Sequence, residues 1–165
     1  LDRTRAPLTV NNFLGYVERG FYSGTTFHRV IPGFMAQGGG YTAEFRERDT
    51  EQPIPNESGN GLSNRRSTIA MARTQNPHSA TAQFFINLAD NQRLDPNSRR
   101  WGYTVFGRVI QGMEVVDRIA AIPTGPAGPF RSDVPSTTVT IKSAKVLDEP
   151  PPQKPAPKPA PTASQ

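Results

Sequence analysis

The sequence contains no cysteine and only two histidines, His28 and His78, in its 165 residues. The absence of cysteine excludes disulfides, thiolate nucleophiles and cysteine-ligated zinc sites. The two histidines lie far apart, and neither stands in a spaced cluster with carboxylates, so metal catalysis is not indicated. A Ser-His-Asp hydrolase is also poorly supported, because the chain lacks a Gly-x-Ser-x-Gly elbow. We therefore expect no metal and no cofactor.

Long apolar stretches are absent as well. No run approaches the roughly eighteen apolar residues that a membrane-spanning helix needs, so we expect no membrane partner. The N-terminal segment LDRTRAPLTV has no apolar core of the signal-peptide type. It begins with Leu1 instead of methionine, and the question of an earlier signal peptide therefore stays open.

Lysine is scarce, with four lysines against fifteen arginines and a formal net charge of +5. A basic, arginine-rich chain suggests nucleic acid or an anionic surface as a partner. The arginines are scattered, however. The only adjacent pairs are 65–66 and 99–100, and neither alternates with aromatic residues on which bases could stack. We therefore do not expect nucleic acid as the main partner.

Proline marks the end of the globular part. Seven of the seventeen prolines stand in the last eighteen residues, DEPPPQKPAPKPAPTASQ. Such a segment favours polyproline II conformers and cannot bury enough apolar area to offset its ordering entropy. We predict one domain over residues 1–148, followed by a disordered proline-rich tail over residues 149–165. A docking motif in the tail is the alternative.

The rest of the chain combines two helical patterns with several strand-like runs. Apolar residues recur at i, i+3, i+4 and i+7 over residues 9–17, which predicts a helix, and a second helix is expected over 113–122, ahead of Pro123. β-Branched and aromatic runs bounded by turn residues predict strands over 25–31, 67–73, 82–88, 103–110 and 137–146. This pattern indicates a mainly β fold, an antiparallel barrel or sandwich with about two helices.

One strand-like run carries an isolated cation. In TTFHRVIPGFMAQGGG, Arg29 stands among apolar and aromatic residues, and a later run, AQFFINL, sets an amide beside paired phenylalanines. A cation in that setting favours a charge-assisted hydrogen bond to an amide or carboxylate. The triglycine run at 38–40 lacks the spacing of a phosphate-binding loop, so a tight bend or a close backbone approach explains it better.

Four blocks of sequence together resemble one family. FYSGTTFHRVIPGFMAQGGG at 21–40, IAMAR at 69–73, SATAQFFINL at 79–88 and GYTVFGRVIQGMEVVDRI at 102–119 closely resemble bacterial cyclophilins, above all those of proteobacteria, in order and spacing. The match runs from about Leu1 to Leu147. It implies a closed eight-stranded antiparallel barrel with two capping helices. Because the match begins late in the family's pattern, we expect the N-terminal strand or strands of the barrel to be missing from this chain.

The resemblance also implies a peptide groove on one outer face of the barrel. The family's catalytic arginine falls on Arg29. Its substrate-binding residues fall on a proline pocket, on two amides that hold the peptide backbone and on a segment that pairs with the extended peptide: Phe34, Met35, Phe85 and Leu94; Gln37 and Gln83; and Ala72, Arg73 and Thr74. His28 is equally a structural histidine or a groove residue. Neighbours in a strand face opposite sides, so Phe84 and Phe85 should point in opposite directions. The resemblance assigns Phe85 to the groove and Phe84 to the core.

Two groove positions differ from the better-known eukaryotic cyclophilins. Arg93 stands where those carry a tryptophan that contacts the inhibitor cyclosporin, so we expect cyclosporin to inhibit this protein weakly. Tyr103 replaces a groove histidine, as in bacterial relatives. A pH dependence linked to that histidine is therefore not expected.

The activity implied by the resemblance is peptidyl-prolyl cis/trans isomerisation, which would assist protein folding. The substrates would be proline-containing peptides and unfolded or folding proteins. The expected chemistry is a hydrogen bond from Arg29 to the proline nitrogen, combined with an apolar pocket for the proline ring. A catalytically idle, proline-peptide binding or chaperone-like module is the alternative. We expect a monomer, and the missing cysteines and the tail composition favour the periplasm over the cytoplasm.

Overall fold

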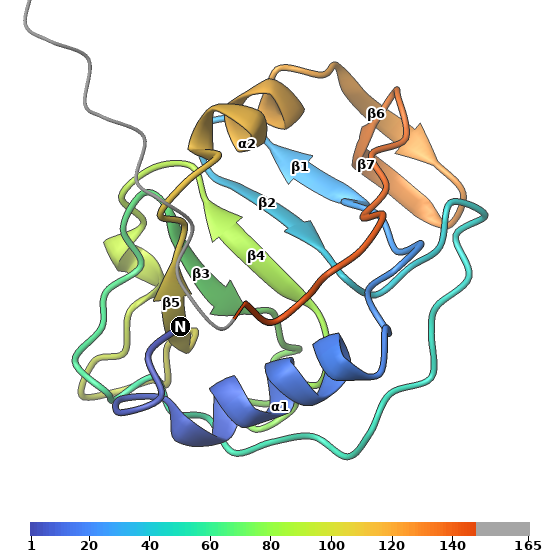
Figure 1. The fold of residues 1–165 in the computed structure, drawn as a ribbon. Helices are drawn as coiled ribbons and strands as arrows, with labels where there is room; N and C mark the ends of the chain where they lie inside the picture. Colours follow the sequence, from blue (N-terminus) through green and yellow to red (C-terminus); the bar gives the residue numbers. More distant parts are fainter. Residues whose placement is uncertain (148–165) are drawn as a thin grey trace, which may run out of the picture.

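The structure is a computed structural model that describes residues 1–147 of the chain. The described residues form two α-helices, one short 3-10 helix and seven strands (Figure 1). In chain order these are α1 (Pro7–Glu18), β1 (Arg29–Ile31), β2 (Met35–Gly38), β3 (Thr68–Met71), β4 (Phe84–Asn87), η1 (Gln92–Leu94), β5 (Val105–Arg108), α2 (Met113–Ala120), β6 (Thr124–Ala127) and β7 (Phe130–Pro135). The predicted tail at 149–165 lies outside the described residues.

The strands form two antiparallel sheets. The larger has the order β1-β2-β4-β3-β5, and β6 pairs with β7 in a separate hairpin. β7 also packs against β1, so the hairpin lies beside one edge of the larger sheet (Figure 1). A mainly β fold with two helices is therefore confirmed.

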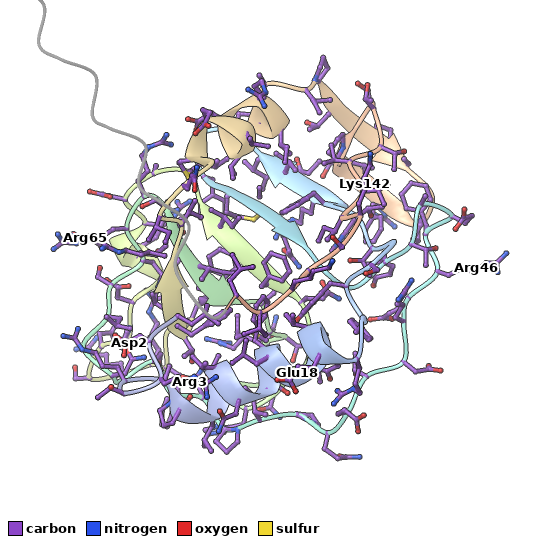
Figure 2. The ribbon with its side chains drawn as sticks, in the orientation of Figure 1. Asp2, Arg3, Glu18, Arg46, Arg65 and Lys142 are labelled. Carbon is purple, nitrogen blue, oxygen red and sulfur yellow. The ribbon has the colours of Figure 1, made fainter. Side chains whose placement is uncertain are left out.

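The two helices cover the core side of the larger sheet. The cluster on the α2 side comprises Val30, Ala36, Ile86, Leu88, Val116 and Ile119. The cluster on the α1 side includes Ala6, Val10, Tyr16, Val17, Tyr22, Met71, Phe84 and Phe106. Figure 2 shows carbon-rich side chains filling these interior spaces, whereas Arg46 and Arg65 point outward. Each large apolar side chain buried here contributes about 1.5–3 kcal/mol to folding. This packing on one face of the larger sheet holds the sheet in place, and with it the opposite face.

A distant loop caps α1. The preceding residue, Ala6, makes no side-chain capping bond, and Pro7 occupies the first turn, where a missing N–H costs nothing. The Glu57 carboxylate accepts hydrogen bonds from the backbone N–H groups of Leu8 and Thr9 at 3.1 and 2.8 Å, and from the Thr9 hydroxyl at 2.6 Å. A negative group at this end also complements the helix dipole. The helix predicted over 9–17 is confirmed and is slightly longer at both ends.

The closed eight-stranded barrel expected from the sequence is not confirmed. Among residues 1–147, the ladder residues form only the five-stranded sheet and the hairpin. The run at 137–146 was predicted to be a strand, but it makes a single isolated bridge, between Thr140 and Thr26. Its backbone nevertheless follows the chain before β1, since Phe27 N–H donates to the Val139 carbonyl at 3.0 Å. None of the described helices has the length and apolar character needed to cross a membrane.

Candidate active site

The strand register sets one straight row of residues across the larger sheet. Arg29 lies opposite Gln37, Gln37 opposite Phe85, Phe85 opposite Ala70 and Ala70 opposite Val105. Side chains that are directly opposite in neighbouring strands share a face and lie about 5 Å apart. The row therefore faces away from both helix-covered clusters. It begins with a cation, continues with an amide and ends in apolar side chains.

A pocket of about 250 Å³ lies on this face. Its lining residues are Arg29, Phe34, Met35, Gln37, Ala72, Arg73, Phe85, Leu94 and Tyr103. All nine are residues for which the sequence predicted a role in catalysis or binding. The apolar floor of the pocket is well packed, because Met35 and Phe85 are almost fully buried in a cluster with Ala70 and Val105. The alternation predicted for Phe84 and Phe85 is confirmed, since Phe84 belongs to the helix-covered core.

Two glutamines support Arg29. Its guanidinium donates to the Gln37 side-chain oxygen at 3.4 Å, and the Gln37 amide nitrogen donates to the Gln83 side-chain oxygen at 3.0 Å. Arg29 itself is exposed, so only this chain of side-chain bonds limits its rotamers. Gln83 in turn approaches Gly40 closely: a Cβ atom added at Gly40 would lie within 2.6 Å of three Gln83 side-chain atoms. The triglycine run thus permits a close approach, as predicted.

A buried chain of amides joins the walls of the pocket from below. The Asn91 side chain donates to the Phe34 carbonyl and to the Asn87 side-chain oxygen, both at 2.8 Å. Asn87 donates to the Asn64 oxygen at 3.1 Å, and Asn64 donates to the Tyr103 carbonyl at 3.2 Å. Fully bonded polar networks of this kind rigidify the structure around them. Phe34 and Tyr103 therefore keep a fixed separation.

The remaining predicted site residues lie elsewhere. Gln83 accepts a hydrogen bond from Gln37 but does not line the pocket. Thr74 is exposed and shares a hydrogen bond with the Ser79 hydroxyl at 2.8 Å. His28 is only 3% exposed and faces the other side of β1, where it packs against Tyr41 and Phe130 with ring centroids 4.7 and 5.2 Å away. The structure therefore does not bring His28 together with Arg29.

His28 lines a second cavity, of about 320 Å³, between the chain before β1 and the β6–β7 hairpin. Burial, with a smaller contribution from the Arg29 cation, lowers the pKa of His28 to about 4, although a hydrogen bond to the Thr26 backbone opposes the shift. The imidazole is therefore neutral at pH 7. This cavity contains no charged side chain among its lining residues, so it offers less chemistry than the pocket beside Arg29.

Comparison with known proteins identifies the family of the chain. The family model described as cyclophilin type peptidyl-prolyl cis-trans isomerase/CLD matches residues 1–146. The chain belongs to the cyclophilin family. Members of this family are peptidyl-prolyl cis-trans isomerases, and the chain is accordingly an enzyme of the isomerase class.

Curated bacterial relatives support this membership over most of their length. Peptidyl-prolyl cis-trans isomerase A of Dickeya dadantii is 53% identical over 147 residues, which cover 89% of this chain and 77% of that protein. Peptidyl-prolyl cis-trans isomerase B of Escherichia coli is 53% identical, with 87% of this chain and 89% of that protein covered.

Solved structures show the same fold. A cyclophilin-type isomerase of Cryptosporidium parvum matches with a TM-score of 0.70 at 25% identity, covering 90% of this chain and 88% of that chain. A second crystal structure of that protein, in the presence of the dipeptide Ala-Pro, matches at 26% identity with a TM-score of 0.66, covering 86% and 85% of the two chains.

Sequence reasoning missed two features of this cyclophilin groove. One is the amide chain beneath it, whose asparagines come from separate loops and strands. The other is the position of two arginines over aromatic rings: Arg93 lies 4.6 Å from the Phe34 ring centroid, and Arg73 lies 4.4 Å from that of Tyr103. Neither pair is close in sequence, so no spacing rule could have found it.

Proposed function

We propose that this chain accelerates rotation about X-Pro bonds by donating a hydrogen bond from Arg29 to the proline nitrogen while the apolar pocket holds the proline ring. The carrying observation is the placement of one guanidinium at the edge of a pocket lined by Phe34, Met35 and Phe85. No nucleophile or general base is needed for this reaction, because no covalent bond is broken.

The barrier to rotation sets what the site must supply. Resonance gives the C–N bond double-bond character, and the barrier is about 18–20 kcal/mol. At the twisted transition state the conjugation is lost and the nitrogen regains a lone pair. A donor aimed at that nitrogen therefore binds the twisted state more strongly than the planar one, and this difference lowers the barrier.

Arginine suits this role because its guanidinium stays protonated and its planar fork can be held in one orientation. The bond from Arg29 to Gln37 provides that hold. A hydrogen bond from a charged donor contributes about 1.5–3 kcal/mol, which corresponds to about 10- to 200-fold in rate. Arg29 therefore accounts for only part of a large acceleration.

The pocket supplies the remainder. Its floor of Met35, Phe85 and Leu94 can fix the ring while the acyl side of the bond turns. A site with few water molecules also favours the less polar twisted amide over the resonance-stabilised planar amide. The Cryptosporidium parvum protein crystallised in the presence of Ala-Pro supports proline-containing peptides as the ligand class.

Peptide backbone on either side of the proline would be held by the polar rim. We place Gln37, Ala72 and Arg73 there, since all three line the same pocket as Arg29. Contacts to backbone and to one proline ring impose little selection on other side chains. Folding chains with many different X-Pro bonds are accordingly the expected substrates, and assistance to folding is the expected role.

Two measurements on one prolyl peptide separate the isomerase from an idle binding module. NMR exchange spectroscopy gives the cis/trans rate, and chemical-shift titration gives the Kd. The proposed function predicts exchange much faster than the uncatalysed time of tens of seconds. It further predicts that Arg29→Ala slows exchange far more than it weakens binding. Tight binding with no acceleration by the unmodified chain would establish the idle module instead.

A further inference from the structure

Guanidinium groups surround the proline pocket. Arg29 lies at the β1 end, and Arg73 lines the pocket from the 72–74 segment. Arg93 stacks on the outer wall, with its guanidinium carbon 4.6 Å from the Phe34 ring centroid. Arg100 donates a hydrogen bond to the Arg93 carbonyl and so lies beside it. The polar rim of an apolar pocket is therefore positively charged.

Arg73 is held rigidly in this rim. Its Nε donates to the Gly102 carbonyl at 3.2 Å, and its two terminal nitrogens donate to the Thr74 and Trp101 carbonyls at 2.9 and 3.1 Å. The face of the guanidinium lies over the Tyr103 ring at 4.4 Å. All of these partners are neutral, so they fix the position of the positive charge without cancelling it.

Within the part of the chain that the structure describes, no carboxylate pairs with the rim arginines. The salt bridges within residues 1–147 involve Arg5, Arg19 and Arg66. The acidic residue nearest in sequence to Arg93 is Asp95, which accepts hydrogen bonds from the Asn64 backbone and side chain at 2.7 and 2.9 Å. Asp95 is thus turned toward the buried amides. The positive rim is left for an external negative group.

We infer that the groove prefers proline peptides with carboxylate side chains next to the X-Pro dipeptide, and that Arg93 and Arg73 set this preference. The inference rests on the proposed isomerase function and adds a substrate class to it. The backbone and proline contacts would still bind any X-Pro sequence. A glutamate or aspartate one residue outside the dipeptide would gain an ion pair that a neutral residue cannot make.

The expected size is modest, because the rim is exposed. Ion pairs between exposed groups change an equilibrium by about two- to fivefold. The attraction should also be screened by salt, since the Debye length falls from about 10 Å at 0.1 M to about 3 Å at 1 M. A glutamate peptide should therefore have a kcat/KM two- to fivefold above its glutamine counterpart at low salt, with a lysine peptide below both.

The test uses acetylated and amidated peptides, which carry no terminal charges. Each has Ala-Pro at its centre, with glutamate, glutamine or lysine either just before the alanine or just after the proline. The pre-proline residue stays constant, so intrinsic exchange rates are matched. NMR exchange spectroscopy gives kcat/KM without a coupling protease. The readout is the kcat/KM of the glutamate peptide divided by that of the glutamine peptide. A general loss of activity lowers both values equally and does not change this ratio.

Two variants locate the effect. Arg93→Gln removes one rim charge and should lower the ratio toward one, with the rest of the preference due to Arg73. Arg65→Gln removes an equal charge from an exposed arginine that points away from the body of the protein (Figure 2), and should leave the ratio unchanged. This control separates local pairing from the attraction of a net positive protein.

The outcomes distinguish the inference from the function on which it rests. A ratio of one or less in the unmodified chain, a ratio that Arg93→Gln leaves unchanged, or a ratio that 1 M salt leaves unchanged overturns the preference while isomerisation of the glutamine peptide stands. Failure to accelerate any of the peptides would contradict the proposed function itself, and the preference would fall with it.

Discussion

The substitution Gly40→Ala tests whether Arg29 is positioned through its neighbours. Gly40 is not among the residues that line the pocket. A Cβ atom there would lie 2.5 Å from the Gln83 Cγ and 2.6 Å from its Cδ and Nε2. Such contacts are too short to persist, so Gln83 must move. Its 3.0 Å hydrogen bond with Gln37 is then lost, and Gln37 no longer fixes Arg29.

The expected loss follows from that bond. A typical intramolecular hydrogen bond contributes about 0.5–1.5 kcal/mol, which corresponds to about 2- to 12-fold in rate if it is needed only for the transition state. We therefore expect kcat/KM to fall by about this factor in Gly40→Ala. The loss should be smaller than that in Arg29→Ala, because a freely rotating arginine still donates part of the time.

Gly59→Ala is the matched control, because nothing lies within 4 Å of a Cβ atom at Gly59. Both substitutions remove a similar amount of backbone freedom from the unfolded chain. The decisive comparison is a double-mutant cycle: in an Arg29→Ala background, Gly40→Ala should cost almost nothing more. Equal activity of the two alanine variants would refute the positioning argument. The same would follow if Gly40→Ala caused an undiminished further loss in the Arg29→Ala background.

Three further results are expected. Buried His28 has a pKa of about 4, so below pH 6.5 the unfolded chain binds a proton at this residue that the folded chain does not. The free energy of unfolding should therefore fall by about 2 kcal/mol between pH 7 and pH 5. Urea melts of the unmodified chain and of His28→Phe would check this, and an equal change in unfolding free energy with pH in both would contradict it. Asn64→Ala should lower the free energy of unfolding by about 2–4 kcal/mol, as thermal melts would show, because Asn64 is fully buried and its side chain bonds to Asp95, Asn87 and the Tyr103 carbonyl. Cyclosporin should inhibit weakly, because Arg93 on the Phe34 ring replaces an aromatic contact; stoichiometric inhibition in a titration would disprove this.

Local sequence patterns predicted the helices and the facing of the central strands well. The helix predicted from Met113 begins at that residue and ends at Ala120, two residues early. Phe84 and Phe85 face opposite sides because a strand has a period of two, which sequence reveals directly. The same alternation puts Arg29 and its neighbour His28 on opposite faces, although it does not indicate which face forms the groove.

Sequence patterns failed where long-range contacts decide the structure. The β6–β7 hairpin was missed because its sequence, TGPAGPFRSDVP, is rich in glycine and proline, which ordinarily indicate loops. A short outlying hairpin tolerates Pro126, whose missing N–H costs nothing at an unpaired edge position. The stacking of Arg93 on Phe34 joins residues 59 positions apart, and only the assembled fold brings them together.

The most direct test of the mechanism is the kcat/KM of Arg29→Ala, measured by NMR exchange spectroscopy on a neutral Ala-Pro peptide beside Arg65→Ala. The outward-pointing Arg65 controls for the loss of one positive charge. A hydrogen bond from Arg29 to the twisted proline nitrogen predicts a drop of about 10- to 200-fold in Arg29→Ala and almost none in Arg65→Ala. Unchanged isomerisation by a folded Arg29→Ala variant would contradict the account.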